Sequence, residues 1–279
     1  MFLSRQDTVE ERAVLASRFQ GSSIYKFGVE VPRSVKHAYY LDKINGDTLW
    51  RKAIAKELGE INSFGVFRET TQDDNLNDYQ KIPYHLMFDV KFDGHCKARL
   101  VADGNWTEVL KEDIYSGVVG LDTVRLGFQL AAMNDLLVCA ADVGTAFLHG
   151  YTREKVYIIA GPEFEGLEGK PLIIHRGIYG LRSSAARFHE HLAHAVRQLG
   201  FRPSKADPDL YVHDRGTYHE YLATYVDDIL IFSLEPMKII EELKTQYTLK
   251  GVGEPQYYLG GISSSVLMSI GTSKVFRQP

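Results

Sequence analysis

Apolar residues along the chain recur in two alternating periods, one typical of helices and one typical of strands. In three segments they fall three and four positions apart, as on the buried face of a helix. These segments are residues 47–61, 116–133 and 183–199. Asp47 and Ser116 are suited to cap the first two helices, and Gly200 to end the third. A fourth helix is expected to begin near Pro236, because proline fits the first helical turn.

Strand-like stretches lie between these helices. The segment IPYHLMFDVKFDGHCKARLVADG predicts two strands joined by a tight turn at Asp93-Gly94. LLVCAAD predicts a short apolar strand that ends at Asp142. LATYVDDILIF predicts a hairpin with Asp227 and Asp228 at its tip, because the flanking residues are β-branched or aromatic. Turns of this kind favour antiparallel pairing, so we expect an α+β fold.

Composition narrows the class of protein only slightly. The chain has 279 residues and a net charge of −4, so a nucleic-acid surface would have to be local. Two cysteines, Cys96 and Cys139, argue against a disulfide framework or a cysteine-rich zinc module and favour a reducing compartment. The N-terminus is charged too early for a secretory signal, and no apolar run reaches the roughly 18 residues of a membrane span. We therefore expect a protein that is not secreted and does not enter a membrane.

Two adjacent aspartates in an apolar hairpin need an explanation. Asp227 and Asp228 repel each other and lose hydration among such neighbours. A plain turn would be better served by Asn-Gly or Asp-Gly, so a turn and a divalent-metal site remain equal alternatives for the pair alone. Asp142, at the end of another apolar strand, adds a third carboxylate. If the three converge, they form the anionic oxygen site that Mg²⁺ prefers, and such sites support phosphoryl transfer.

Six sequence blocks occur in the order and spacing of a known family. They are DTLWRKAIAKELGEINSFGVF, GHCKARLVADGNWTE, AADVGTAFLHGYTREKVYI, IYGLRSSAARFHEHL, YVDDILI and LKGVGEPQYYLG. Together they resemble the reverse transcriptase of Ty1/copia-type LTR retrotransposons over residues 29–261, most of the chain. YVDD by itself would be a weak signal, but six ordered blocks are a strong one.

The resemblance implies a right-hand polymerase with fingers and a palm, whose antiparallel sheet is backed by helices. The implied divisions are an N-terminal extension at residues 1–46, fingers at 47–114, a palm at 115–261 that includes a template-contacting segment at 150–205, and a short tail at 262–279. The implied activity is RNA-directed DNA synthesis by two-metal nucleotidyl transfer. Asp142, Asp227 and Asp228 would be the catalytic residues and the ligands of two Mg²⁺ ions, with Mn²⁺ as a substitute.

The same resemblance implies partners and a cellular location. The partners are an RNA or DNA template with its primer, deoxynucleoside triphosphates (dNTPs), and the rest of a Pol polyprotein. No RNase H, integrase or protease signature is present in this chain, so we expect those parts elsewhere in the polyprotein. The expected location is a cytoplasmic virus-like particle or the nucleus.

Four further positions match substrate-contacting positions of the family. Lys97 and Arg99 alternate along a strand and so share a face, which would bind the triphosphate; a solvated strand face is the alternative. Phe147 would lie beneath the incoming sugar and exclude a 2′-hydroxyl; a core phenylalanine is the alternative. Lys250 would lie near the leaving pyrophosphate as a general acid; an ordinary exposed lysine is the alternative.

A local excess of positive charge suggests where nucleic acid binds. Residues 170–205 contain seven Lys or Arg and one acid, Glu190. Such an excess fits a surface that follows template–primer phosphates, and Arg182 and Arg187 are its candidates. The alternative is the polar face of a single helix.

Departures from the family pattern keep a second function open. Ser183 or Ser184 stands where the family has glutamine, Ala186 where it has proline, and Asp103 where it has a basic or small residue. These changes fall in segments that would support the template base and the dNTP. A catalytically degenerate remnant that binds nucleic acid is therefore the alternative function. A nucleotidyl cyclase with a palm fold is disfavoured by the KARLVADG and YGL segments.

Overall fold

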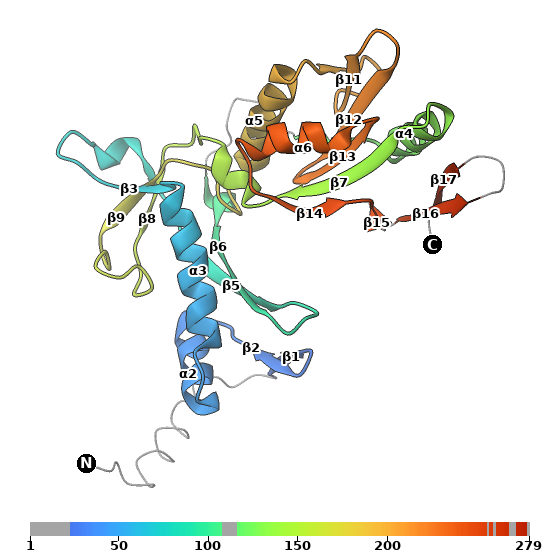
Figure 1. Ribbon diagram of the computed structural model, residues 1–279. Helices are drawn as coiled ribbons and strands as arrows, with labels where there is room; N and C mark the ends of the chain where they lie inside the picture. The colour runs from blue at the N-terminus through green and yellow to red at the C-terminus, as the bar shows by residue number, and fades with distance from the viewer. Residues whose placement is uncertain (1–22, 108–115, 256, 259–260, 268–271, 278–279) are drawn as a thin grey trace. The chain divides into compact units, whose positions relative to one another are not determined.

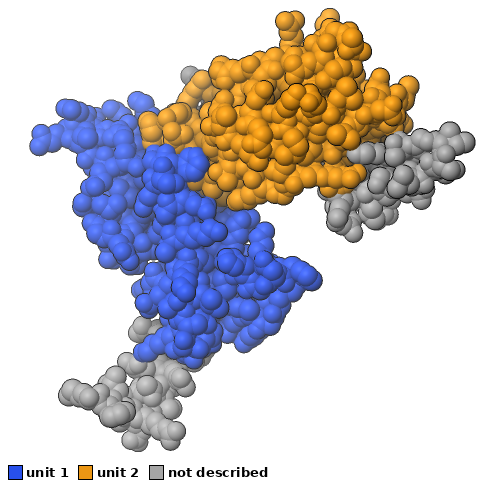
Figure 2. Space-filling model, in the orientation of Figure 1, with its two compact units in different colours: residues 1–107, 155–173 blue, residues 108–154, 174–279 orange. Residues whose placement is uncertain are grey.

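The computed structural model describes residues 23–107, 116–255, 257–258, 261–267 and 272–277. The chain forms two compact units (Figure 2). The first consists of residues 1–107 and 155–173, and the second of residues 108–154 and 174–279. The chain thus leaves the first unit, returns to it once and ends in the second. No helix in the described part is long and apolar enough to cross a membrane.

In its described residues, the first unit contains helices α2 and α3, with short strands before and after them (Figure 1). Its elements are β1 (Ile24–Lys26), β2 (Val29–Val31), α2 (Val35–Asn45), α3 (Leu49–Ser63), β3 (Phe67–Glu69), the 3-10 turn η1 (Leu76–Asp78), β4 (Gln80–Lys81), β5 (Tyr84–Val90), β6 (Cys96–Ala102), η2 (Gly104–Trp106), β8 (Val156–Ile159) and β9 (Pro171–Ile174). Strands β3, β9, β8 and β4 form one sheet in that order, and residues 155–173 belong to this unit because β8 and β9 complete it.

Helix α3 confirms the predicted helix, but its start differs from the prediction. Thr48, not Asp47, holds the N-cap position and makes no side-chain cap. The amides of Trp50 and Arg51 instead donate to the carboxylate of Asp42, each at 2.9 Å. Asp42 is buried in α2, so the first turn of α3 is capped by a neighbouring helix rather than by its own sequence.

The β5–β6 hairpin confirms the strand–turn–strand prediction. Its buried face carries alternate residues of β6, and Leu100 donates its amide to Glu57 of α3 at 2.9 Å. Lys97 and Arg99 share the opposite, half-buried face, as period-two alternation requires. Lys97 lies opposite Asp89 on β5, and Arg99 lies opposite Met87.

The second unit is built on a six-stranded antiparallel sheet in the order β10-β11-β12-β13-β7-β14 (Figure 1). Its elements are α4 (Leu121–Met133), β7 (Leu137–Val143), η3 (Ala146–His149), α5 (Ser184–Gln198), β10 (Arg202–Pro203), β11 (Leu210–Asp214), β12 (His219–Tyr225), β13 (Asp228–Ser233), α6 (Pro236–Lys244) and β14 (Leu249–Gly253). These elements confirm the α+β class.

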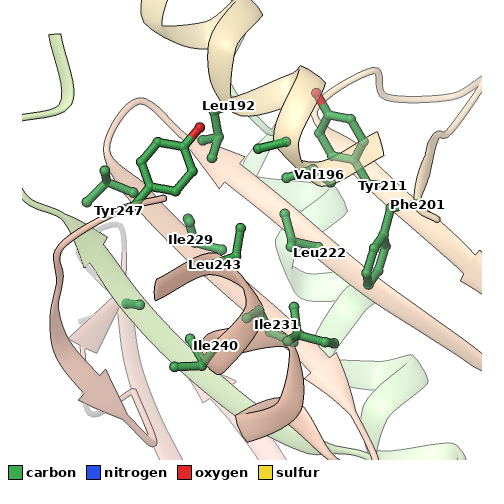
Figure 3. Packing of buried hydrophobic residues seen from close by; sticks show 14 of the residues in the cluster. Leu192, Val196, Phe201, Tyr211, Leu222, Ile229, Ile231, Ile240, Leu243 and Tyr247 are labelled. Carbon is green, nitrogen blue, oxygen red and sulfur yellow. The ribbon is translucent and has the colours of Figure 1, made fainter. Parts of the chain in front are cut away.

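Helices cover both faces of this sheet. Helices α5 and α6 pack on alternate residues such as Ile229 and Ile231 of β13 (Figure 3). Helix α4 packs on the intervening residues, Leu230 and Phe232. A strand buried on both faces is continuously apolar, which explains the run ILIF after the aspartate pair.

Helix α4 begins later than the predicted Ser116. Gly120 holds the N-cap position without a side chain to cap the helix. Asp207 accepts the Gly120 amide at 3.0 Å, so a carboxylate from outside the helix again replaces the expected local cap.

The C-terminal residues that we expected to form a short tail contain strands. They are β16 (Gly261–Leu267), which begins one residue before the expected tail, and β17 (Thr272–Arg277). With β15 (Tyr257–Tyr258), which precedes the expected tail, they form a three-stranded antiparallel sheet. At the other end, residues 1–22 of the expected N-terminal extension lie outside the described residues, while residues 24–45 contain β1, β2 and α2.

Candidate active site

Two of the three predicted aspartates lie side by side in the sheet of the second unit. Strands β7 and β13 pair antiparallel with Asp142 directly opposite Asp228. Residues directly opposite each other share one face of a sheet, with Cβ atoms about 5 Å apart. Both side chains are half-buried. Like charges in this arrangement are destabilising, so the pairing has no evident structural benefit.

The third aspartate lies in the hairpin turn. Tyr225 pairs with Asp228, which leaves Val226 and Asp227 as the two loop residues. The tip is therefore Val226-Asp227 rather than the predicted Asp227-Asp228. The amide of Val143 donates to the carbonyl of Asp227 at 2.7 Å, so the turn is bonded to the strand that carries Asp142.

The turn contains an uncommon backbone conformation. Val226 has φ of 54°, in the left-handed region that a β-branched residue rarely adopts. A positive φ at the first loop residue is a requirement of the type II′ hairpin turn, where glycine is preferred. The conformation costs about 1–3 kcal/mol and persists only because the surrounding contacts hold it. Strain of this kind clusters at functional sites.

Burial and charge together act on Asp228. Burial, followed by the charges of Asp227 and Asp142, raises the pKa of Asp228 to about 6. A nearby cation would reverse the two charge effects. Over the described part of the chain, no three His, Cys, Asp or Glu side chains are arranged to hold a metal ion, so the expected convergence of three carboxylates is not observed. Mutual repulsion opposes such an approach. Mg²⁺ requires only one or two protein carboxylates when substrate phosphates complete its coordination, and these aspartates fit that role.

Lys250 lies on the other side of Asp142. Strand β14 pairs with β7 so that Lys250 is directly opposite Asp142. Its side chain passes over Gly144, where an added Cβ would come within 3.1 Å of both Cε and Nζ. Because opposite residues share a face, Lys250, Asp142, Asp228 and Tyr225 form one row across four strands. The predicted general acid thus stands next to the predicted metal ligands.

Phe147 lies in the turn that follows the Asp142 strand. It belongs to η3, and its ring meets Tyr179 edge-to-face with centroids 5.0 Å apart. It is partly buried and also packs against the hydrophobic core of the unit. These contacts suit a core residue and a sugar-contacting residue alike, so its proposed role stays a prediction.

The segment that departs from the family pattern has its own stabilising contacts. Ser183 donates its amide and hydroxyl to the carboxylate of Glu154, at 3.0 and 2.6 Å. Ser184 donates to the carbonyl of Ile178 at 2.7 Å. All three polar side chains are buried. The two serines therefore hold the start of α5 in place.

The two predicted template contacts differ in accessibility. Arg182 is half-buried. The Arg187 side chain is only 6% exposed and donates to Glu190 at 2.9 Å. A phosphate contact by Arg187 would require this ion pair to open, so the prediction depends mainly on Arg182.

Lys97 and Arg99 belong to the first unit, whereas the aspartates belong to the second. Asp103, which departs from the family pattern near them, has Oδ1 2.9 Å from His85 Nδ1. This contact gives the unexpected carboxylate a partner.

Two residues of this region were missed from the sequence. Tyr225 stands three positions before Asp228, and only the two-residue turn shows that they are partners. Glu154 lies in a polar stretch that suggests an exposed loop, yet it is 6% exposed. The sequence around Glu154 does not show that this residue is buried, because its hydrogen-bond partner, Ser183, is distant in the sequence.

Comparison with known proteins identifies the family of this chain. A sequence profile described as "Reverse transcriptase (RNA-dependent DNA polymerase)" matches residues 71–268, and the chain belongs to that family. The chain is 30% identical over 188 residues to the retrovirus-related Pol polyprotein from transposon TNT 1-94 of Nicotiana tabacum, covering 62% of this chain and 14% of the relative. It is 28% identical over 208 residues to the Transposon Ty1-DR1 Gag-Pol polyprotein of Saccharomyces cerevisiae, covering 68% and 11%. The predicted Ty1/copia-type resemblance is confirmed.

A further relative and one solved structure complete the comparison. The Pol polyprotein from transposon RE1 of Arabidopsis thaliana is 29% identical over 171 residues, covering 59% of this chain and 12% of the relative. A foamy viral protease-reverse transcriptase in complex with double-stranded DNA matches with a TM-score of 0.42 and 19% identity, covering 76% of this chain and 33% of that one. This chain therefore spans a small part of the length of its curated relatives.

Proposed function

We propose that this chain is the catalytic core of a reverse transcriptase, which adds dNTPs to a primer 3′ end on an RNA or DNA template. The observation that carries the proposal is the register of β7 against β13, which sets Asp142 opposite Asp228. The bond from Val143 to the carbonyl of Asp227 then attaches the third aspartate to the same strand. Membership of the reverse transcriptase family supports the same conclusion.

The aspartates would hold two Mg²⁺ ions, with Asp142 and Asp227 as the principal ligands and Asp228 in support. When bound, the ions supply activation of the primer 3′-hydroxyl and stabilisation of the leaving oxygen. The raised pKa of Asp228 supports the assignment, because a carboxylate among carboxylates favours a cation. Lys250, opposite Asp142, would give a proton to the departing pyrophosphate.

The remaining assignments concern the substrates. Lys97 and Arg99 would neutralise the triphosphate, and Phe147 would exclude a 2′-hydroxyl. Arg182, with Arg187 once its ion pair opens, would contact template–primer phosphates, with an affinity that falls as salt rises. The relatives are Pol polyproteins, so the chain would act beside an RNase H and other Pol segments, in a virus-like particle or in the nucleus.

Two observations favour the alternative, a remnant that binds nucleic acid without synthesis. Arg187, a predicted template contact, is occupied by Glu190, and serines stand where the family has glutamine. A remnant would retain affinity for template–primer but would not extend it.

Primer extension on poly(rA)/oligo(dT), with Mg²⁺ or Mn²⁺, tests the proposal. The wild-type chain should extend the primer, and Asp227→Asn and Asp142→Asn should each reduce extension by at least about 100-fold. Asp122→Asn is the matched control, because the Asp122 side chain is 95% exposed on α4 and forms an ion pair with Arg125 at 2.8 Å. Binding of the same duplex is measured in parallel. Binding without extension under either metal would establish the remnant, and equal extension by Asp227→Asn would remove the metal-ligand assignment.

A further inference from the structure

A short loop that contains Phe147 follows the strand of Asp142. We call residues 144–150 the Gly144–Gly150 loop. The amide of Gly144 donates to the carbonyl of Thr248 at 2.8 Å, which fixes the loop's start. Thr145 adopts a left-handed φ of 54° and donates its hydroxyl to the Gly144 carbonyl at 2.7 Å. The loop thus reverses the chain within a few residues of Asp142.

His149 bonds the end of this loop to its beginning. Its ring makes a hydrogen bond to the backbone of Gly144. The ring is also enclosed, with its centroid 4.9 Å from that of Tyr247 and 5.8 Å from that of His191. Only 8% of the residue is exposed. The side chain therefore fixes how far the loop can open.

The residues around His149 are themselves fixed by neighbouring elements. His191, on α5, has Nδ1 2.7 Å from the hydroxyl of Tyr247. Tyr247 follows α6 and is 3% exposed, with its ring close to Leu192 of α5 (Figure 3). His149 is thereby attached to α5 and to the segment that follows α6, on one face of the aspartate sheet.

Arg176 holds the same loop through its backbone. One guanidinium nitrogen donates to the carbonyls of Leu148 and His149, at 3.3 and 3.2 Å. The other donates to the hydroxyl of Tyr151 at 2.7 Å. A cation bonded to two successive carbonyls fixes the orientation of that turn.

The loop also has no room to move toward α5. A Cβ added at Gly150 would come within 2.9 Å of the backbone of Arg187. One added at Gly177 would come within 2.7 Å of the carbonyl of Phe147. Backbone at this spacing cannot shift inward, so His149 and Arg176 limit the remaining outward movement.

We infer that His149 is a positioning residue, which holds the Gly144–Gly150 loop so that Asp142, two residues before the loop, and Phe147 within it keep a fixed separation. The inference rests on the proposed function, for which the positions of both residues matter. A misplacement of about 1 Å at a reacting centre costs on the order of 100-fold in rate. A histidine that only fills the core would be replaceable by leucine of similar volume, and this difference makes the inference testable.

The test compares three replacements of His149 with one control. His149→Leu keeps the volume and removes the hydrogen bond. His149→Asn and His149→Gln each place an amide near one of the two ring nitrogens, so one of them can restore the bond to Gly144. The control is His194→Asn, because His194 is exposed on α5, one turn beyond His191. Each protein is assayed on poly(rA)/oligo(dT) for kcat, KM for dTTP, and preference for dTTP over UTP.

His149→Leu is expected to lower kcat about tenfold or more and to weaken the preference for dTTP, with a smaller change in KM. One of the amide variants should recover most of the loss, and the control should match the wild type. Equal kcat and preference in His149→Leu and wild type would overturn the inference. The inference would also be overturned if all three variants lost activity equally, in proportion to the loss of folded protein measured by thermal unfolding.

Amide hydrogen exchange separates this inference from the proposed function, because it needs no activity. In His149→Leu the amides of Leu148 and Gly150 should exchange about tenfold faster than in wild type, while those of β12 and β13 stay unchanged. If the wild type extends no primer but this exchange pattern is found, the proposed function fails and the positioning of the loop stands. If exchange in the loop is unchanged, the positioning role is wrong whatever the activity.

Discussion

The amide of Val143 donates to the carbonyl of Asp227 at 2.7 Å, and this bond joins two parts of the site that are far apart in the sequence. Val143 directly follows Asp142, and Asp227 directly precedes Asp228. Because Asp142 is also the cross-strand partner of Asp228, the three carboxylates are attached to one backbone frame. Such a frame would meet the condition for electrostatic preorganisation if the proposed function is correct.

The first prediction concerns strain in that frame. Val226→Gly should be more stable than Val226→Ala by about 1 kcal/mol, because glycine adopts a positive φ without strain and alanine does not. Urea denaturation of the two variants measures the difference. Equal midpoints, or a more stable alanine variant, would show that the left-handed φ of Val226 carries no strain.

The second prediction is the effect of pH through Asp228. Its pKa in the folded protein is raised to about 6, above its ordinary value of 3.8, so the folded state retains this proton longer than the unfolded state. In the presence of a chelator, the free energy of unfolding should therefore fall as pH rises from about 4 to 6, by roughly 2 kcal/mol after allowance for partial exposure. Asp228→Asn should lose this slope, and Mg²⁺ should stabilise the wild type more at pH 7.5 than at pH 4.5. Thermal unfolding between pH 4 and 8 is the measurement.

The third prediction has the opposite sign and concerns His149. Burial, followed by the charge of His191, lowers the pKa of His149 to about 4, while Arg176 acts in the same direction and the bond to Gly144 opposes it. The unfolded state therefore binds this proton first as pH falls, and stability from the neutral ring should decline between about pH 6.5 and 4, by on the order of 3 kcal/mol. The slope of Asp228 overlaps this pH range with the opposite sign, so His149 and His149→Asn are compared in an Asp228→Asn background. An unchanged slope in His149→Asn would contradict the prediction.

Sequence patterns predicted a helix or strand correctly where the contacts that determine it lie close together in the chain. Helix α5 runs from Ser184 to Gln198, close to the prediction of 183–199, because its apolar period and terminal glycine are in the sequence itself. The apolar strand that carries Asp142 and the aspartate pair 85 residues later (227 − 142) were both recognisable, although the strand ends one residue later than predicted, at Val143. Their cross-strand register is what the structure adds.

Sequence patterns failed where contacts are distant. The return of residues 155–173 to the first unit depends on β4 pairing parallel with β8, about 75 residues on, and no local period marks it. The turn was misplaced by one residue because a valine at positive φ is unfavourable by itself. Glu154 was missed because the residue that donates to its carboxylate, Ser183, is distant in the sequence.

The fourth prediction tests a distant cap. Asp42→Ala should destabilise the protein by about 2 kcal/mol, because it leaves the amides of Trp50 and Arg51 without their carboxylate acceptor. Asp47→Ala should cost less than about 1 kcal/mol, since Asp47 is only half-buried and accepts the Leu49 amide at a longer 3.2 Å. Chemical denaturation of both variants gives the comparison. If Asp47→Ala were the more destabilising of the two variants, Asp47 rather than Asp42 would be the cap of α3.

The fifth prediction uses two helical glycines with opposite surroundings. A Cβ added at Gly127 on α4 would come within 2.7 Å of the Phe232 ring, in the strand that begins with Asp228. Gly127→Ala should therefore destabilise the protein by about 1–3 kcal/mol, since Phe232 is fully buried and cannot move aside. Gly59 on α3 has nothing within 4 Å of such an atom, so Gly59→Ala should stabilise by about 1 kcal/mol through helix propensity alone. Thermal unfolding of the two alanine variants should shift in opposite directions. A shift of Gly127→Ala in the same direction as Gly59→Ala would mean that α4 does not pack against Phe232 at this spacing.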